Sequence, residues 1–344
     1  MTQDVIIHQE GQCGRITLNR PDALHALNEP MCAAILAALT AWASDDGIAH
    51  VLIDHAEGSR GFCAGGDIRM LATSGAGDGS EARAFFATEY RMNTALFNFP
   101  KPVIAIMDGV TMGGGVGLSV HGAYRVATER TLFAMPETGI GLFPDVGGGW
   151  FLPRLDGEIG TWLALTGARL KGADVWHAGV ATHFTASESI DDLKAELVKA
   201  GPAALDGLDA PKTEPGFAEA LPVINGCFAH DRAEDIRDCL IADGGAWASK
   251  QVEFLASKSP RTVKVALRQV REGAAFTRFE DNMINEYRIG ARQVQSDDFI
   301  EGVRAVIIDK DHSPNWAHAS LEDVPDSLID EVFAPLGEGR ELTF

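Results

Sequence analysis

The sequence of 344 residues has no apolar run close to the roughly 20 residues that a membrane-spanning helix needs. Cationic side chains are scarce, since 29 Lys and Arg stand against 49 Asp and Glu and give a formal net charge of −20. This charge excludes an extended nucleic-acid surface, and an anionic ligand would need a local cluster of cations and backbone amides. The first residues lack both the apolar core of a signal peptide and the Arg/Ser-rich character of a transit peptide, so we expect a cytoplasmic protein.

Several common motifs are also missing. No Gly-x-Gly-x-x-Gly dinucleotide fingerprint and no His-x-x-x-His metal pair occur, and the phosphate-loop-like "GARLKGA" carries Ala173 where Lys is required. "GLSVH" resembles a nucleophile elbow but ends in His121, and Ser119 and His121 would point to different sides of a helix. We therefore expect neither a metal site nor a serine nucleophile.

Cysteines are few and odd in number. No Cys-x-x-Cys occurs among them, so we expect reduced thiols rather than a disulfide framework. The five positions are 13, 32, 63, 227 and 239.

The first 200 residues alternate between strand and helix patterns, which predicts an α/β core. Residues 201–216 are typical of a linker, and the patterns beyond are mostly helical. We therefore predict a domain of residues 1–200 followed by a mainly helical region of residues 201–344. The expected strands are two within 4–19, then 50–55, 102–109, 124–127 and 131–135; the expected helices are 29–44, 80–98, 147–155, 158–166, 231–242, 246–257, 260–272 and 276–296. "EYR" occurs at 89–91 and 286–288 without further similarity, so we infer no repeat.

Two glycine-rich segments carry chemistry. "FCAGGDIRM" (62–70) and "MGGGVGLSV" (112–120) each place small residues at an expected helix start, where backbone N–H groups lack acceptors and favour negative charge. Two such amides converging on one oxygen would form an oxyanion hole. Close packing of helix on strand is an equally simple reason for these glycines.

A third segment, "FAMPETGIGLFPDVGGG" (133–149), is apolar and glycine-rich except for Glu137 and Asp145. Isolated buried carboxylates are costly because the charged form loses its hydration. Both acids therefore either point into water or belong to a site that uses them.

These segments, together with "LNRPDALHALN" (18–28), resemble the crotonase (enoyl-CoA hydratase/isomerase) superfamily from about residue 5 to 320. The resemblance implies a crotonase-like spiral of ββα units with a helical C-terminal region, and chemistry on acyl-CoA thioesters. It assigns the two oxyanion-hole amides to Gly66 and Gly114. Members often trimerise, but the insertion at 185–250 leaves a homo-oligomer as an open expectation.

The resemblance also implies contacts to coenzyme A. They fall on His25, Ala26 and Leu27 in one loop and on Asp67, Ile68 and Arg69 in a second. For Arg69, a surface salt bridge is an equal alternative. Coenzyme A would be part of the substrate, so we expect no cofactor.

The acids separate the activities of the family. A hydratase needs a second glutamate at the position of Gly117, whereas the acid at Glu137 is present. A carboxylate at Asp145 is similar to the 3-hydroxyisobutyryl-CoA hydrolase subfamily, as are the flanking segments and residues 259–269 and 297–316. Glu137 would then attack the thioester or activate a water. Asp145 would accept a hydrogen bond from the 3-hydroxyl of the substrate or orient water.

This resemblance implies hydrolysis of 3-hydroxyisobutyryl-CoA in valine catabolism, with 3-hydroxypropionyl-CoA as a second candidate substrate. It also places a substrate contact at Glu89, for which a solvent-facing helix charge is an equal alternative. Two rival functions remain: a Δ3,Δ2-enoyl-CoA isomerase that uses Glu137 alone, and a non-catalytic acyl-CoA-binding module. Loss of Glu137, Gly66 or Gly114 would have favoured the latter.

Overall fold

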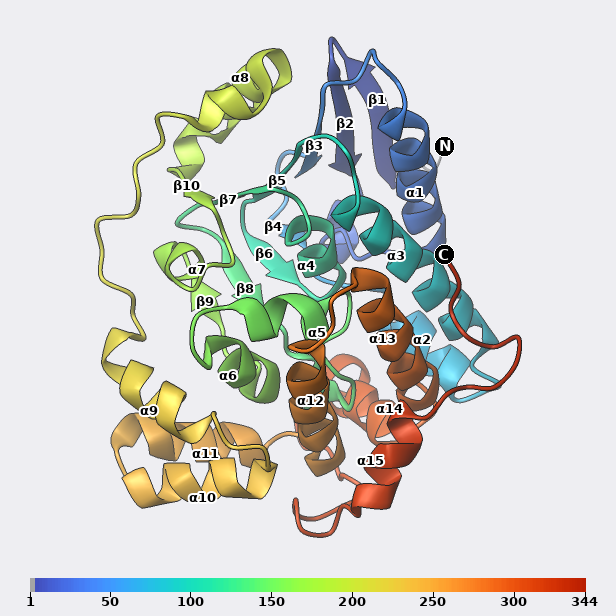
Figure 1. Cartoon of the computed structure of the whole chain (residues 1–344), viewed down its shortest axis with the longest axis vertical. Helices are drawn as coiled ribbons and strands as arrows, with labels where there is room; N and C mark the ends of the chain where they lie inside the picture. Colours follow the sequence, from blue (N-terminus) through green and yellow to red (C-terminus); the bar gives the residue numbers. More distant parts are fainter. Residues whose placement is uncertain (1–3) are drawn as a thin grey trace. The chain divides into compact units, whose positions relative to one another are not determined.

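The structure of the chain is a computed structural model that describes residues 4–344. It forms two compact units, each assembled from separate segments of the chain (Figure 1). The first consists of residues up to Asp67, Thr88–Ala134 and Arg169–Gly216, and the second of Ile68–Ala87, Met135–Ala168 and Phe217–Phe344. The predicted division at residue 200 stays a prediction, since these units are discontinuous in sequence.

The first unit is built on a six-stranded sheet in which β1 pairs antiparallel with β2 and the other pairs are parallel. All six residues of β3 are buried, as expected for a strand covered on both faces. In spatial order the strands are β1 (Val5–Glu10), β2 (Cys13–Leu18), β3 (His50–His55), β5 (Val103–Met107), β7 (Tyr124–Ala127) and β10 (His183–Phe184).

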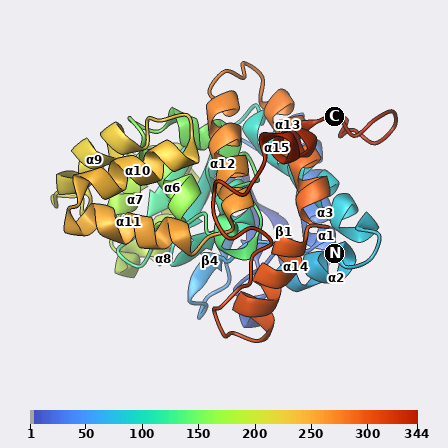
Figure 2. The same ribbon diagram turned by 90° about the horizontal axis from the view of Figure 1, so that it is seen from below.

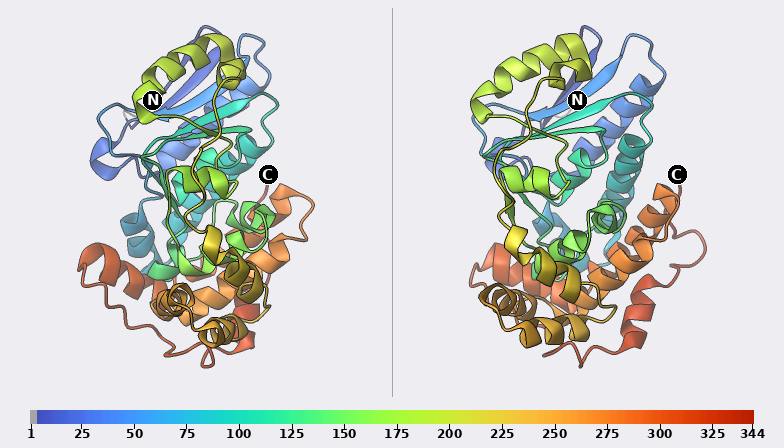
Figure 3. Two further views of the ribbon diagram at one scale, coloured as in Figure 1. Left: turned by 90° about the vertical axis from the view of Figure 1, so that its left-hand side faces the viewer. Right: turned by 60° about the vertical axis from the view of Figure 1, so that its left-hand side comes forward.

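Two helices cover this sheet. Side chains alternate between the faces of a strand, and Cys13 and Leu52 pack with Leu193 and Leu197 of α8 (Ile190–Ala200). Figure 3 shows α8 lying over this sheet. The neighbouring Gly14 leaves room for the indole of Trp42 on α1 (Glu29–Ala43), which therefore lies on the other face.

A four-stranded sheet completes the first unit and carries its glycine-rich segments. Strands β4 (Gly61–Cys63), β6 (Val110–Met112) and β8 (Leu132–Ala134) are parallel, and β9 (Leu170–Lys171) runs antiparallel to β8. The short helices α4 (Gly114–Ser119) and α7 (Ala173–His177) follow β6 and β9.

The second unit is helical. Its α9, α10 and α11 lie side by side (Figure 2), and α12 packs against α5, α6 and α15. The helix α3 (Ser80–Phe97) begins in this unit and ends in the first. The remaining helices are α2 (Ile68–Gly75), α5 (Gly148–Phe151), α6 (Ile159–Thr166), α9 (Leu221–Cys227), α10 (Ala233–Asp243), α11 (Ala246–Ala256), α12 (Pro260–Gly273), α13 (Phe279–Gln293), α14 (Asp297–Val303) and α15 (Asp326–Phe333).

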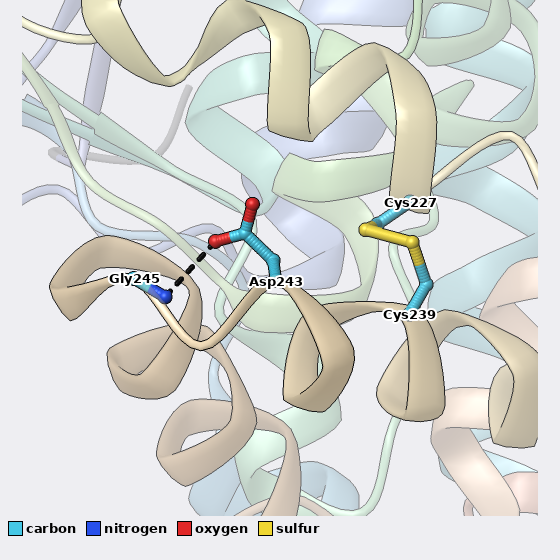
Figure 4. Close-up of a disulfide and its surroundings, with 4 residues drawn as sticks. All are labelled: Cys227, Cys239, Asp243 and Gly245. Atoms are coloured by element: carbon cyan, nitrogen blue, oxygen red, sulfur yellow. Dashed lines mark hydrogen bonds between the residues drawn. A yellow bond between two sulfur atoms is a disulfide. The ribbon is translucent and has the colours of Figure 1, made fainter.

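The expectation of reduced thiols was wrong for one pair. Cys227 at the end of α9 and Cys239 on α10 form a disulfide (Figure 4). A turn of only a few residues between the two helices brings these cysteines together, whereas Cys13, Cys32 and Cys63 are free and buried.

The alternation of strands and helices confirms the predicted α/β core, and the main helices of the second half lie where their periodicity placed them. Residues 201–216 are less irregular than expected, because a 3-10 turn covers Gly201–Leu205 and Leu205 packs against the sheet. Helices α7, α8, α9, α14 and α15 were not predicted. Between residues 4 and 344, no helix combines the length and hydropathy that crossing a bilayer requires.

Candidate active site

The first glycine segment is held by the loop that precedes α1. Leu27 N–H donates to Gly65 O at 2.7 Å and Asp67 N–H donates to Leu27 O at 2.9 Å. This parallel bridge pairs Leu27 with Gly66 and does not use the N–H of Gly66. The Gly66 amide is thus placed by its neighbours and stays outside the bridge.

The second glycine segment turns directly into α4. Gly113 has φ 46° and ψ −121°, a backbone conformation that a side chain would strain, and Gly114 begins the helix. As the first helical residue, Gly114 has no intrahelical acceptor for its N–H. This turn presents the Gly114 amide at the end of β6.

The two glycine segments lie against each other. A Cβ added to Gly65 would come within 3.8 Å of Gly114 N, and one added to Gly114 would lie 3.0 Å from Leu27 Cδ1 and 3.3 Å from the Gly65 carbonyl carbon. The structure therefore brings together Gly66 and Gly114, the two residues to which the resemblance assigned an oxyanion hole.

Glu89 on α3 faces the same place. Its side chain is 2% exposed, and its Oε1 lies 2.8 Å from the position of a Gly114 Cβ. The alternative of a solvent-facing helix charge was therefore wrong. A contact between Glu89 and substrate stays a prediction.

The predicted coenzyme A contacts differ in accessibility. His25 and Leu27 are fully buried, whereas Ala26 between them is half-buried. Arg20 ties this loop together by donating to Ala26 O at 2.9 Å and to the carboxylate of Asp67 at 3.2 Å.

The remaining two predicted contacts begin α2, in the second unit. Ile68 is half-buried, and the exposed Arg69 donates to Ile307 O at 3.4 Å. For Arg69, the alternative of a surface salt bridge is not seen among the described residues, and its hydrogen bond is to a backbone carbonyl. Contact with coenzyme A stays a prediction at all six positions.

Glu137 opens the 3-10 turn Glu137–Ile140 in the second unit. The turn is anchored at its next residue: Thr138 O accepts hydrogen bonds from Ser259 N–H and the hydroxyl of Thr262, both at 3.3 Å, and Ser259 is the N-cap of α12. The start of a long helix therefore fixes the turn that carries Glu137.

The carboxyl group of Glu137 is buried and incompletely bonded. Glu137 is 5% exposed, and among residues 4–344 its Oε2 has no hydrogen-bond partner. Burial raises the pKa of Glu137 well above its usual value, the negative charge of Asp145 raises it further, and the charge of Lys258 opposes this shift. A buried carboxyl oxygen without a hydrogen-bond partner makes Glu137 a candidate functional group, and its catalytic role stays a prediction.

Asp145 lies in the same unit, 6% exposed, on the loop that leads into α5. Neither Glu137 nor Asp145 is solvated, which excludes the alternative that both point into water. Sequence reasoning missed another buried acid of this unit, Glu286 on α13, although its "EYR" had been noted; Gly147 N–H donates to it at 2.8 Å.

Ser119, which the sequence excluded as a nucleophile, and Cys63 are both unsuited to nucleophilic catalysis. Ser119 is fully buried and donates to Gly115 O at 2.9 Å, inside its own helix. Burial raises the pKa of the Cys63 thiol to about 12, so no thiolate forms near neutral pH. Gly117, the position at which a hydratase needs its second acid, is buried within α4.

Several known proteins are similar to this chain in sequence and in structure. The family model for enoyl-CoA hydratase/isomerase matches residues 13–333. The protein named "3-hydroxyisobutyryl-CoA hydrolase, mitochondrial" is 46% identical in Danio rerio, over 97% of this chain and 90% of that protein. The protein of that name in Gallus gallus is 45% identical, over 97% of this chain and 89% of its own length.

Two solved structures match nearly the whole chain and confirm the predicted crotonase-like fold. A carnitinyl-CoA dehydratase from Mycobacterium thermoresistibile has a TM-score of 0.94 at 39% identity and covers 100% of this chain and 99% of its own. An enoyl-CoA hydratase from Rhodobacter sphaeroides has a TM-score of 0.91 at 40% identity, covering 99% and 100%. From these matches and the arrangement of its glycine turns, the chain belongs to the enoyl-CoA hydratase/isomerase family.

Proposed function

We propose that the protein hydrolyses the thioester of 3-hydroxyisobutyryl-CoA to coenzyme A and the free hydroxy acid, a reaction of valine catabolism. The observation that carries this proposal is the buried pair of acids, Glu137 and Asp145, in a chain 45–46% identical to proteins named 3-hydroxyisobutyryl-CoA hydrolase. 3-Hydroxypropionyl-CoA, which also carries a 3-hydroxyl, is a second candidate substrate.

In this proposal, the amides of Gly66 and Gly114 hold the thioester oxygen and Glu137 acts on the carbonyl carbon. Strand topology supports it: β6 and β8 pair in parallel with Met112 opposite Ala134, so the chain leaves both strands at one edge of the sheet. Gly114 follows Met112 by two residues, and Glu137 follows Ala134 by three.

The reaction would proceed by one of two routes. In the first, the carboxylate of Glu137 forms a bond to the carbonyl carbon, and the C–S bond of the resulting oxyanion breaks to release the thiolate of coenzyme A. Water then cleaves the mixed anhydride and restores the carboxylate. In the second, Glu137 takes a proton from a water that attacks the thioester directly. Both routes consume one water and require ionised Glu137.

In this proposal, Asp145 recognises the 3-hydroxyl of the substrate. A buried carboxylate can accept a hydrogen bond from that hydroxyl, and an acyl group without a hydroxyl forgoes this bond. We therefore expect Asp145→Asn to lower kcat/KM for 3-hydroxyisobutyryl-CoA much more than for isobutyryl-CoA. An equal loss on both would remove Asp145 from substrate recognition.

The acids that are present argue against two rival activities, hydration and isomerisation. The similar solved structures carry the names of a dehydratase and a hydratase, yet Gly117 offers no second acid for hydration. An isomerase could work with Glu137 alone, but it gives Asp145 no role.

The deciding experiment measures thiol release. The purified protein is incubated with 3-hydroxyisobutyryl-CoA, crotonyl-CoA and a 3-enoyl-CoA, and free coenzyme A is read with a thiol-reactive dye while double bonds are followed by absorbance. Release from the hydroxyacyl substrate alone supports the proposal. A shifted or hydrated double bond without thiol release would establish an isomerase or a hydratase. Tight binding of these acyl-CoA thioesters without any reaction would establish a binding module.

Compartment and assembly are separate questions. The similar vertebrate proteins carry "mitochondrial" in their names, so they give no support to the expectation of a cytoplasmic protein, which stays a prediction. A homo-oligomer likewise stays a prediction.

A further inference from the structure

The loop that carries Asp145 has a backbone conformation that is unfavourable for Val146. Val146 has φ 51° and Gly147 φ 90°. A β-branched residue in the left-handed region is strained, and such strain persists only where surrounding groups hold the chain. Hydrogen bonds with side chains of neighbouring helices hold this loop.

Glu286 on α13 is the main one. Its Oε2 accepts a hydrogen bond from Gly147 N–H at 2.8 Å, and its Oε1 accepts one from Gly149 N–H at 3.0 Å. One fully buried carboxyl group therefore bridges the backbone on both sides of Gly148.

Two side-chain amides, one on α13 itself and one on the neighbouring α12, also donate to Glu286. Asn282 donates to Glu286 Oε1 at 2.9 Å, and Gln269 on α12 donates to the same oxygen at 3.2 Å. Gln269 also donates to Pro144 O at 2.7 Å, just before Asp145. Glu286 and Gln269 thus fix the loop at both of its ends.

Glu286 is surrounded by hydrogen-bond donors. Four N–H groups point at its two oxygens, an arrangement that favours the ionised carboxylate over the protonated acid. Burial raises the pKa of Glu286 to about 8, and the charge of Asp145 adds to this, whereas the bonds from Gly147, Asn282 and Gly149 lower it.

We propose that Glu286 is a positioning residue for Asp145: by bonding Gly147 and Gly149 it holds the loop so that the Asp145 carboxyl can meet the 3-hydroxyl of the substrate. This inference rests on the proposed function, in which Asp145 recognises that hydroxyl. Glu286 itself touches no substrate.

The loop lies directly against α12 and α13. A Cβ on Gly149 would lie 2.5 Å from Asn282 Oδ1, and one on Gly273 of α12 would lie 1.8 Å from Gly149 O. This close approach brings the loop backbone within reach of the side chains of Gln269 and Glu286.

The test compares kcat and KM for 3-hydroxyisobutyryl-CoA and isobutyryl-CoA in the full-length protein. Glu286→Gln keeps the volume but sets an NH2 against a backbone N–H, and we expect it to lower the preference for the hydroxylated substrate about tenfold. Turnover of isobutyryl-CoA should change less than threefold; where that turnover is too slow, its inhibition constant replaces kcat/KM. Glu280→Gln, at a half-exposed position of the same helix that pairs with Arg278 at 3.6 Å, is the matched control and should change neither.

A double-mutant cycle separates positioning from simple stabilisation. In an Asp145→Asn background, Glu286→Gln should cause no further change of the preference, because the residue through which it acts is gone. An equal loss on both substrates, or a full effect in the Asp145→Asn background, would overturn the inference.

Two further measurements keep the test decisive. If Glu286→Gln does not fold, Gln269→Met removes the bond to Pro144 and should lower the preference in the same direction; an unchanged preference there counts against the inference. The wild-type protein alone decides the proposed function. If it shows no preference for the hydroxylated substrate, hydrogen exchange still tests whether Glu286 holds the loop. Unchanged protection of the Gly147 and Gly149 amides in Glu286→Gln would refute that role.

Discussion

The negative charge of Asp145 raises the pKa of Glu137, eight residues earlier in the chain and buried in the same unit. Both proposed routes use the ionised form of Glu137. We therefore expect kcat/KM to fall on the acid side along a limb centred well above pH 4.5.

Asp145→Asn should move this limb to lower pH, because it removes a charge that opposes ionisation of Glu137. The measurement is a pH profile of kcat/KM for isobutyryl-CoA, which does not depend on the 3-hydroxyl. A limb at unchanged or higher pH in the variant would contradict the coupling.

Glu137→Gln should reduce kcat by on the order of 10³-fold or more, while coenzyme A still binds with its wild-type Kd. Single-turnover kinetics and calorimetry measure the two quantities. A variant that keeps most of its activity would dismiss both routes.

The same variant should be more stable at neutral pH. The folded pKa of Glu137 lies above its unfolded value, so its contribution is fully present below pH about 4.5 and is lost as pH rises through the folded pKa. Gln carries no charge and avoids this loss, which we expect to raise Tm by about 2 °C at pH 8 and by nothing at pH 4.5. An equal difference at both pH values would point to packing instead.

Gly114→Ala should lower kcat by about tenfold to a hundredfold, less than the roughly 10²–10³-fold loss that follows complete removal of an oxyanion donor. The new Cβ would lie 2.8 Å from Glu89 Oε1 and 3.0 Å from Leu27 Cδ1, so these side chains or the amide must shift. Gly226→Ala, where nothing lies within 4 Å of the added atom, is the matched control. Wild-type kcat in the Gly114 variant would exclude this amide from the reaction.

Reduction should destabilise the protein through the Cys227–Cys239 disulfide, which spans 12 residues. A loop of that size is worth about 3 kcal/mol, so Tm should fall by several degrees in dithiothreitol. The double variant Cys227→Ala/Cys239→Ala should show the low Tm with and without reductant. A wild-type Tm that ignores reductant would show that the bond adds nothing.

Local pattern was sufficient for much of the fold. The predicted strand 50–55 is β3, and the predicted helix 29–44 ends one residue later than α1, because these segments combine unbroken apolar or helical spacing with clear end signals. α8 was missed although it is amphipathic, since its charged face obscured the leucines that pack on the sheet.

The candidate site was predictable only where a motif names it. Glu137, Asp145, Gly66 and Gly114 came from recognisable segments, but the role of Glu286 depends on a partner 139 residues away. Its one signal was "EYR", shared with Glu89: both acids are buried on long helices beside a glycine-rich turn. Three letters without flanking similarity could not show that.

The position of α8 in the chain matters for synthesis on the ribosome. Strands β1, β2, β3, β5 and β7 are complete by Ala127, yet the leucines that cover Cys13 and Leu52 begin at Leu193. At about 5–20 residues per second, roughly 60 residues take several seconds to emerge. During that interval a nascent chain exposes the apolar sheet face that α8 later covers.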